Sequence, residues 1–289
     1  MLRILGTLFA ALLGLAFGSF LNVCLSRWPE GESVVHPRSH CRNCGRMLPW
    51  WENIPLVSWI ALRGHCRACG AWISARYPLV EAAVGVLWAL LVWYSNEDVF
   101  VADVPPGVRA LNIGATICGM GFFWLLVALA ALDAENLWLP DFLTYTGIAA
   151  GIALKVVFEQ FGYHPGAISR PFHILLVSVA SAAAAAALVL LIRWTYWLVR
   201  RREGLGLGDA KLMALLAAWL GLPLALLSLF LGVVLGALAG VSLLIGHKRH
   251  TEESWAVAKL PFGTFLCLGG IVSALWGQQI LSAYLRLFF

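Results

Sequence analysis

The chain has 289 residues, of which 61% are hydrophobic and only 12% are charged, and its mean hydropathy is +0.83. These values exclude a soluble globular protein and indicate an integral membrane protein that lies in a lipid bilayer. The formal net charge of +5 does not indicate nucleic-acid binding in so apolar a chain, because the basic residues of a membrane protein gather in the loops on one side of the bilayer.

An uncharged stretch over residues 4–26 comes first and matches the ~20 residues that a helix needs to cross a bilayer. It is longer than the ~7–15-residue core of a signal peptide, so we expect residues 1–26 to form a retained first transmembrane helix. A polar segment over residues 27–76 follows, with seven Arg, three Glu and four Cys. This segment is long enough for a small folded module.

The four cysteines of that module form two CxxC pairs separated by 21 residues, and a glycine follows each pair. Two CxxC turns can supply four thiolates in tetrahedral geometry, which is typical of a structural zinc site because no position is left open for water. The predicted zinc ligands are Cys41, Cys44, Cys66 and Cys69. The alternative is a set of cytosolic redox or idle thiols.

Residues 77–289 are predicted to form a transmembrane helical domain. Its apolar runs lie at 77–96, 110–132, 141–158, 171–192 and 261–284, with a further uncharged run at 212–246. As one helix, the last of these would be ~52 Å long against a hydrocarbon core of ~30 Å. Gly221-Leu222-Pro223 predicts a break, which gives a short arm beginning at Asp209 and a full span up to Gly246. The expected total is about eight transmembrane helices in an all-α protein.

The basic loops support this count. With a break at Gly221, the loops at 27–76, 193–211 and 247–259 share one face and hold most of the Lys and Arg, which marks that face as cytoplasmic. The loop at 133–141 lies on the same side. Asp133 and Asp209 are therefore expected at one membrane surface, although seventy-six positions separate them.

Two carboxyl groups that meet at a poorly solvated boundary resist ionising together and tend to hold one shared proton. In such a pair the ionised acid can take a proton from water while the protonated acid hydrogen-bonds a scissile carbonyl, as in aspartic proteases. Asp133 and Asp209 are the predicted catalytic pair. The alternative is that each acid is an ordinary solvated helix end, since Asp209 stands where an acid favours a helix N-terminus, and Asp141 is a candidate helix cap.

Two other classes of protein stay open on these residues alone. A membrane thiol oxidoreductase would use the CxxC pairs, but it would need them on the oxidising face. A cation-coupled transporter would place acids deep within its spans and show an internal repeat. The sequence contains no HExxH, GxSxG or GxxxxGK[ST] motif, so zinc hydrolases, serine hydrolases and nucleotide-driven pumps lack their usual signals.

An ordered set of motifs over nearly the whole chain resembles the bacterial type IV prepilin peptidases, which are GxGD membrane aspartyl proteases. The motifs are Gly18-Ser19-Phe20-Leu21-Asn22-Val23, the two CxxC pairs, Pro49-Trp50-Trp51-Glu52-Asn53-Ile54-Pro55, Arg76-Tyr77-Pro78-Leu79-Val80-Glu81, Leu132-Asp133 with Leu139-Pro140-Asp141, Gly206-Leu207-Gly208-Asp209-Ala210-Lys211, and Pro261-Phe262-Gly263.

The resemblance implies an enzyme of the bacterial inner membrane that removes the basic leader of type IV prepilins and of type II secretion pseudopilins on the cytoplasmic side. It implies Asp133 and Asp209 as the catalytic pair and the four paired cysteines as zinc ligands. Many bacterial members also methylate the new amino terminus with S-adenosylmethionine. No recognisable fingerprint locates a site for that cofactor here, and the oligomeric state stays open.

Overall fold

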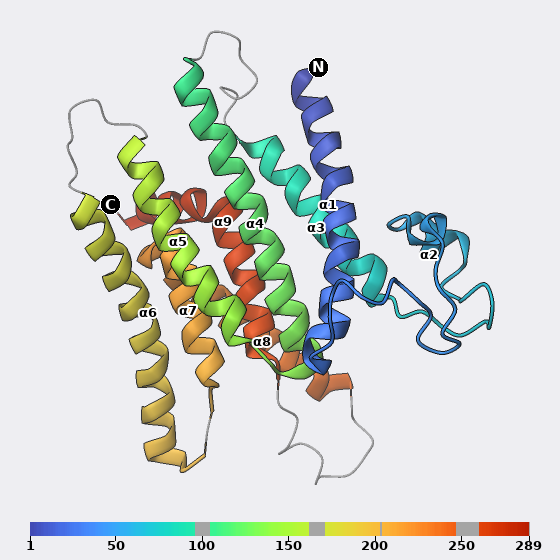
Figure 1. Cartoon of the computed structure of the whole chain (residues 1–289). Helices are drawn as coiled ribbons and strands as arrows, with labels where there is room; N and C mark the ends of the chain where they lie inside the picture. The colour runs from blue at the N-terminus through green and yellow to red at the C-terminus, as the bar shows by residue number, and fades with distance from the viewer. Residues whose placement is uncertain (96–104, 162–170, 203, 247–259, 289) are drawn as a thin grey trace. The chain divides into compact units, whose positions relative to one another are not determined.

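The computed structural model describes residues 1–95, 105–161, 171–202, 204–246 and 260–288 (Figure 1). These ranges contain helices and two isolated β-bridges, and they contain no β-strand, as expected for an all-α protein. The basic loop expected at 247–259 lies outside the described residues. The chain divides into two compact units, Met1–Ala131 and Leu132–Phe289, which we describe separately as unit 1 and unit 2.

Unit 1 holds α1 (Leu2–Arg27), η1 (Trp28–Glu30), η2 (Trp50–Asn53), α2 (Val57–Ala61), α3 (Arg76–Tyr94) and most of α4 (Pro106–Asn136). Helices α1 and α3 pack side by side (Figure 1). Glycines allow a close approach between them: a Cβ on Gly14 would lie 2.8 Å from the Cα of Gly85, and one on Gly18 would lie 2.7 Å from the Cα of Glu81. Gly14 and Gly18 thus lie where the two helices come closest.

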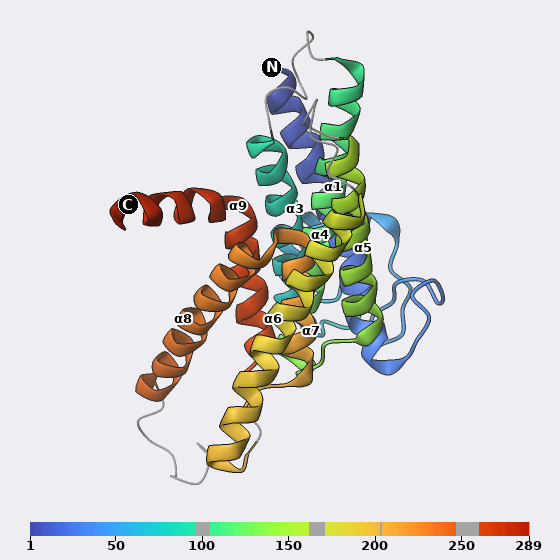
Figure 2. The same ribbon diagram turned by 90° about the vertical axis from the view of Figure 1, so that its left-hand side faces the viewer.

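Unit 2 holds the last turns of α4 with α5 (Asp141–Phe161), α6 (Pro171–Arg200), α7 (Leu207–Leu220), α8 (Leu222–Gly246) and α9 (Phe262–Phe288). Helix α7 packs against α5, α6, α8 and α9 (Figures 1 and 2). From Leu212 onward its side chains are apolar on all faces and most are buried, as expected of a helix enclosed by other helices. The first turn of α7, which carries Asp209, is thus held by the surrounding packing.

The predicted break is confirmed at Gly221, where φ is +84° and α7 gives way to α8. Proline follows at the second position of α8, where its missing N–H costs no helical hydrogen bond. In the described ranges, seven helices are long and apolar enough to cross a membrane, which makes the chain a multi-pass membrane protein. Helix α7 has 14 residues and does not meet that length, so the expected total of about eight is reached only if this arm is counted.

Helices α8 and α9 also approach closely. A Cβ on Gly269 would lie 2.3 Å from the carbonyl oxygen of Ser228, so only glycine fits at this crossing. Small residues at helix crossings commonly permit such close contacts in membrane proteins. The packing fixes the beginning of α9 beside α8, and the beginning of α9 contributes to the site described next.

Candidate active site and metal centre

Asp209 lies in the first turn of α7, where only 7% of the residue is exposed. Its Oδ2 accepts a hydrogen bond of 2.9 Å from the backbone N–H of Gly206, the residue that caps the helix. The helix begins two residues before the predicted start at Asp209. The carboxyl group therefore stabilises the helix N-terminus, where the helix dipole favours negative charge, and is at the same time withdrawn from water.

Asp133 lies in the last turn of α4, with 6% of the residue exposed. The predicted span ends directly at Asp133, but the helix continues to Asn136. Its Oδ2 accepts hydrogen bonds from Thr264, 2.7 Å from the backbone N–H and 3.2 Å from the hydroxyl. Thr264 is in the first turn of α9, so the carboxyl group of Asp133 lies at the N-terminus of a second helix.

The structure brings the two predicted acids together within unit 2. A Cβ on Gly208 would lie 3.0 Å from Cδ1 of Leu139, and a Cβ on Gly263 would lie 3.1 Å from the same atom. Gly208 precedes Asp209, and Gly263 touches the carboxyl group of Asp133. The residues beside both acids therefore pack against one side chain, that of Leu139. Two buried acids thus share one site at the N-termini of two helices.

The sequence alone indicates no function for Gly263 and Thr264, the residues that contact Asp133. The motif Pro261-Phe262-Gly263 was the available signal, because glycine beside a helix start permits the close approach seen here. A Cβ on Gly263 would lie only 3.0 Å from Cγ of Asp133. Thr264 follows this motif directly and supplies both of the donors above.

Asp141, the candidate helix cap, has a different environment. It is the first residue of α5 and forms an ion pair with Lys211, whose ammonium also lies 5.3 Å from the ring centre of Tyr145. The side chain of Asp141 is 64% exposed. Asp141 is thus an exposed acid paired with a cation, whereas Asp133 and Asp209 are buried.

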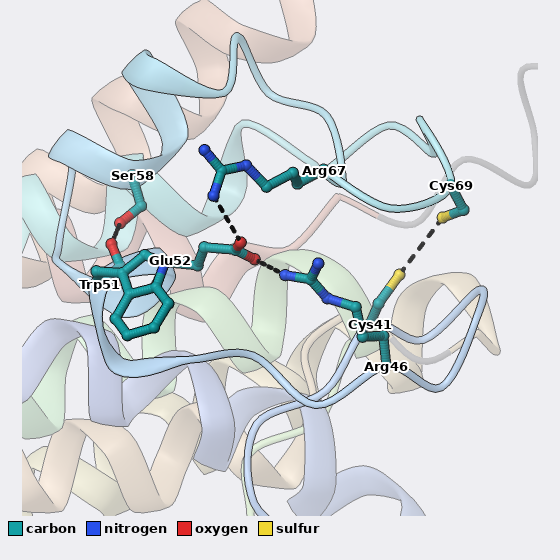
Figure 3. Close-up of polar contacts among 7 residues, drawn as sticks. All are labelled: Cys41, Arg46, Trp51, Glu52, Ser58, Arg67 and Cys69. Carbon is teal, nitrogen blue, oxygen red and sulfur yellow. Dashed lines mark hydrogen bonds and ion pairs between the residues drawn. The ribbon is translucent and has the colours of Figure 1, made fainter.

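The four predicted metal ligands converge. The sulfur atoms of the two CxxC pairs all lie within 4.8 Å of one another, and Sγ of Cys41 is 3.8 Å from Sγ of Cys69 (Figure 3). Four soft sulfur donors in one cluster can bind a metal ion.

Each CxxC pair forms the same turn. In the first, the N–H of Gly45 donates to the carbonyl of Cys41 at 2.8 Å, and in the second the N–H of Gly70 donates to the carbonyl of Cys66 at 2.9 Å. Both glycines have positive φ, +71° and +69°, a conformation that other residues adopt at a cost. The glycine after each CxxC pair therefore has a backbone role.

The thiols in this cluster influence one another. A hydrogen bond from the amide of Asn43 lowers the pKa of Cys69 to about 6, so that this sulfur is a thiolate at neutral pH. The N–H of Arg46 acts to lower the pKa of Cys44, but desolvation and the neighbouring sulfurs of Cys41 and Cys69 raise it to about 11. A metal cation among the four sulfurs would favour the thiolate form of every one of them.

Glu52 connects the two turns. Its buried carboxylate, 5% exposed, forms an ion pair with Arg46 after the first CxxC pair and lies 3.7 Å from Nη1 of Arg67 within the second (Figure 3). One carboxylate thus holds both halves of the cluster in register, as outer-shell residues of metal sites commonly do.

Comparisons with known proteins agree with this arrangement. Residues 12–95 match the model of the bacterial peptidase A24 N-terminal domain, and residues 120–241 match the model of the type IV leader peptidase family. A protein of Stutzerimonas stutzeri named prepilin leader peptidase/N-methyltransferase is 33% identical over 96% of this chain and 93% of its own length. The chain belongs to the type IV leader peptidase family. Two other relatives carry the same name. The protein of Pseudomonas putida is 34% identical over 96% of this chain and 93% of its own length. The protein of Myxococcus xanthus is 36% identical over 89% of this chain and 70% of its own length.

No solved structure matches the chain significantly. The family membership favours a peptidase over the thiol oxidoreductase and the cation-coupled transporter that the sequence left open. The division into domains at residues 26 and 76, and the catalytic and metal-binding roles of the named residues, stay predictions.

Proposed function

We propose that this protein cleaves the basic leader of type IV prepilins and of type II secretion pseudopilins, with Asp133 and Asp209 as the catalytic pair. The observation that carries the proposal is that two acids separated by seventy-six positions are both buried and lie at one site around Leu139. The names of the relatives support the substrate class. Their family membership also supports a place in the bacterial inner membrane with the site on the cytoplasmic side, as the basic loops predict.

In this mechanism one carboxyl group is ionised and the other is protonated. The ionised acid takes a proton from a water molecule, whose oxygen attacks the scissile carbonyl carbon, while the protonated acid hydrogen-bonds the carbonyl oxygen as negative charge develops there. The tetrahedral intermediate then collapses. The C–N bond breaks and a carboxyl group delivers its proton to the leaving nitrogen. This nitrogen becomes the new, free amino terminus of the mature pilin.

We further propose that the same protein methylates this new amino group with S-adenosylmethionine, as the N-methyltransferase part of the relatives' name supports. This donor, when bound, supplies an electrophilic methyl carbon. The amine nitrogen forms a bond to that carbon as the S–C bond breaks, which yields S-adenosylhomocysteine and releases a proton from the amine.

The metal that best fits the cysteine cluster is a structural Zn²⁺. Zinc–thiolate bonds of ~2.3 Å at tetrahedral angles separate neighbouring sulfurs by ~3.8 Å. The separation between Sγ of Cys41 and Sγ of Cys69 is 3.8 Å. Residues 27–76 contain little apolar core, so a bound zinc ion would contribute to the folding of this module.

The direct experiment is incubation of the purified protein with a candidate prepilin, with and without S-adenosylmethionine. Mass spectrometry of the product reads both activities. We expect the leader to be lost in both reactions. We expect the product to gain one methyl group only in the reaction that contains S-adenosylmethionine. An intact prepilin in both reactions would contradict the proposed function.

A further inference from the structure

A cavity of about 980 Å³ lies within unit 1, between the last turns of α1, the cysteine module and the first turns of α3. Its volume is at the upper end of the ~300–1,000 Å³ that small-molecule sites occupy. We propose that this cavity binds S-adenosylmethionine and that the carboxylate of Glu81 lies against the positive charge of the sulfonium. This inference rests on the methylation step proposed above and assigns it a site.

Glu81 lines the cavity and is only 7% exposed. Its Oε2 accepts a hydrogen bond of 2.8 Å from the N–H of Leu56. Among the described residues no cation is paired with this carboxylate. Burial of a carboxylate is costly unless a positive charge lies near it, so the cavity favours a cationic ligand.

The second buried acid of the cavity wall shows the contrast. Glu52 is paired with the guanidinium groups of Arg46 and Arg67, so its charge is compensated within the chain. Arg27 also lines the cavity, but its guanidinium donates to the carbonyls of Ser33 and Pro37 at 2.7 and 2.6 Å. Glu81 is therefore the buried acid of the cavity wall whose charge a bound cation would compensate.

The other lining groups suit the rest of the ligand. Asn22 is 2% exposed, and its Nδ2 donates to the carbonyl of Tyr77 at 2.9 Å, whereas its Oδ1 has no hydrogen-bond partner in the part of the chain that the structure describes. A buried amide oxygen normally has a donor, and a ribose hydroxyl or an amino group could supply one. Trp59 and Trp72 also line the cavity, and aromatic side chains favour a planar base such as adenine.

A carboxylate opposite the sulfonium distinguishes the methyl donor from its product. S-adenosylmethionine carries the sulfonium charge, and S-adenosylhomocysteine has lost it with the methyl group. A buried charge pair is strong because water does not screen it. The site should therefore hold the donor more tightly than the product, which favours exchange of one for the other after each transfer.

The test is the binding affinity of the full-length, zinc-loaded protein in detergent for each of the two compounds, measured by calorimetry. Glu81→Gln keeps an acceptor for the N–H of Leu56 and removes only the charge. We expect this variant to bind S-adenosylmethionine about tenfold more weakly or worse, and S-adenosylhomocysteine nearly as before. The control is Asp141→Asn, an exposed acid of unit 2 that is not among the residues lining the cavity, for which we expect both affinities to stay unchanged.

Zinc content and thermal melting check that each variant is folded. Unchanged donor affinity in Glu81→Gln, or an equal loss for both compounds, would overturn the assignment of Glu81. Failure of the unaltered protein to bind S-adenosylmethionine would instead refute the methylation step itself. Ultraviolet crosslinking of the donor, followed by peptide mass spectrometry, locates the site without any variant: adducts are expected within residues 16–81, and adducts confined to unit 2 would contradict the cavity.

Discussion

Gly263 touches the carboxyl group of Asp133 so closely that a Cβ added to it would lie 3.0 Å from Cγ. The variant Gly263→Ala therefore forces Asp133 to move by a few tenths of an ångström. Since a displacement of ~1 Å at a catalytic group can cost ~100-fold in rate, we expect leader cleavage to fall by about tenfold. The measurement is the rate of prepilin cleavage. Gly121→Ala is the control, because a Cβ on Gly121 meets nothing within 4 Å, and an equal loss there would contradict the explanation.

Asp141 offers a matched comparison for the catalytic pair. It lies only eight positions after Asp133, but its side chain is exposed and paired with Lys211. An exposed ion pair contributes ~0–1 kcal/mol to the free energy of unfolding, so Asp141→Asn should change thermal stability little and leave leader cleavage within about twofold. Loss of cleavage in this variant as complete as in Asp133→Asn would show that burial does not distinguish the two acids.

The cysteine cluster predicts one zinc ion per chain. Cys41→Ser removes one of four thiolates, and we expect the purified variant to contain little zinc by mass spectrometry of the metal, together with greater protease sensitivity over residues 27–76. Cys118→Ser, a thiol outside the cluster, should retain the full zinc content. A stoichiometric zinc content in Cys41→Ser would show that the metal lies elsewhere.

Glu52 should affect the metal without binding it. Glu52→Gln removes the charge that holds Arg46 and Arg67, and loss of such outer-shell contacts typically weakens metal binding ~10–100-fold. We expect zinc to transfer to a colorimetric chelator about ten times faster. Glu30→Gln disrupts an ion pair with Arg42 that is about half exposed, and should release zinc at the original rate.

Much of the fold follows from the sequence because bilayer thickness and hydrophobic length set the spans. The break at Gly221 is an example, since thirty-five uncharged residues exceed one crossing and only glycine and proline interrupt them. The ends of helices are less predictable. Helix α4 continues three residues past Asp133, because side chains at a helix end are set by their contacts and not by hydropathy.

The site was predictable in its acids and not in the residues around them. Asp133 and Asp209 stood out as ionisable residues at the margins of apolar runs. Thr264 did not, because a threonine in the first turn of a helix is common and only the three-dimensional contact gives it a partner. The pairing of Glu81 with the module likewise depends on a hydrogen bond to Leu56 across twenty-five positions, which no local pattern indicates.

The central claim is that Asp133 and Asp209 act as a pair. Its most direct test is the cleavage of a prepilin by purified Asp133→Asn and Asp209→Asn, each shown to be folded and zinc-loaded. We predict that neither variant removes the leader, because an amide can neither take the proton of water nor return one to the leaving nitrogen. Leader cleavage at the unaltered rate by either variant would contradict the account.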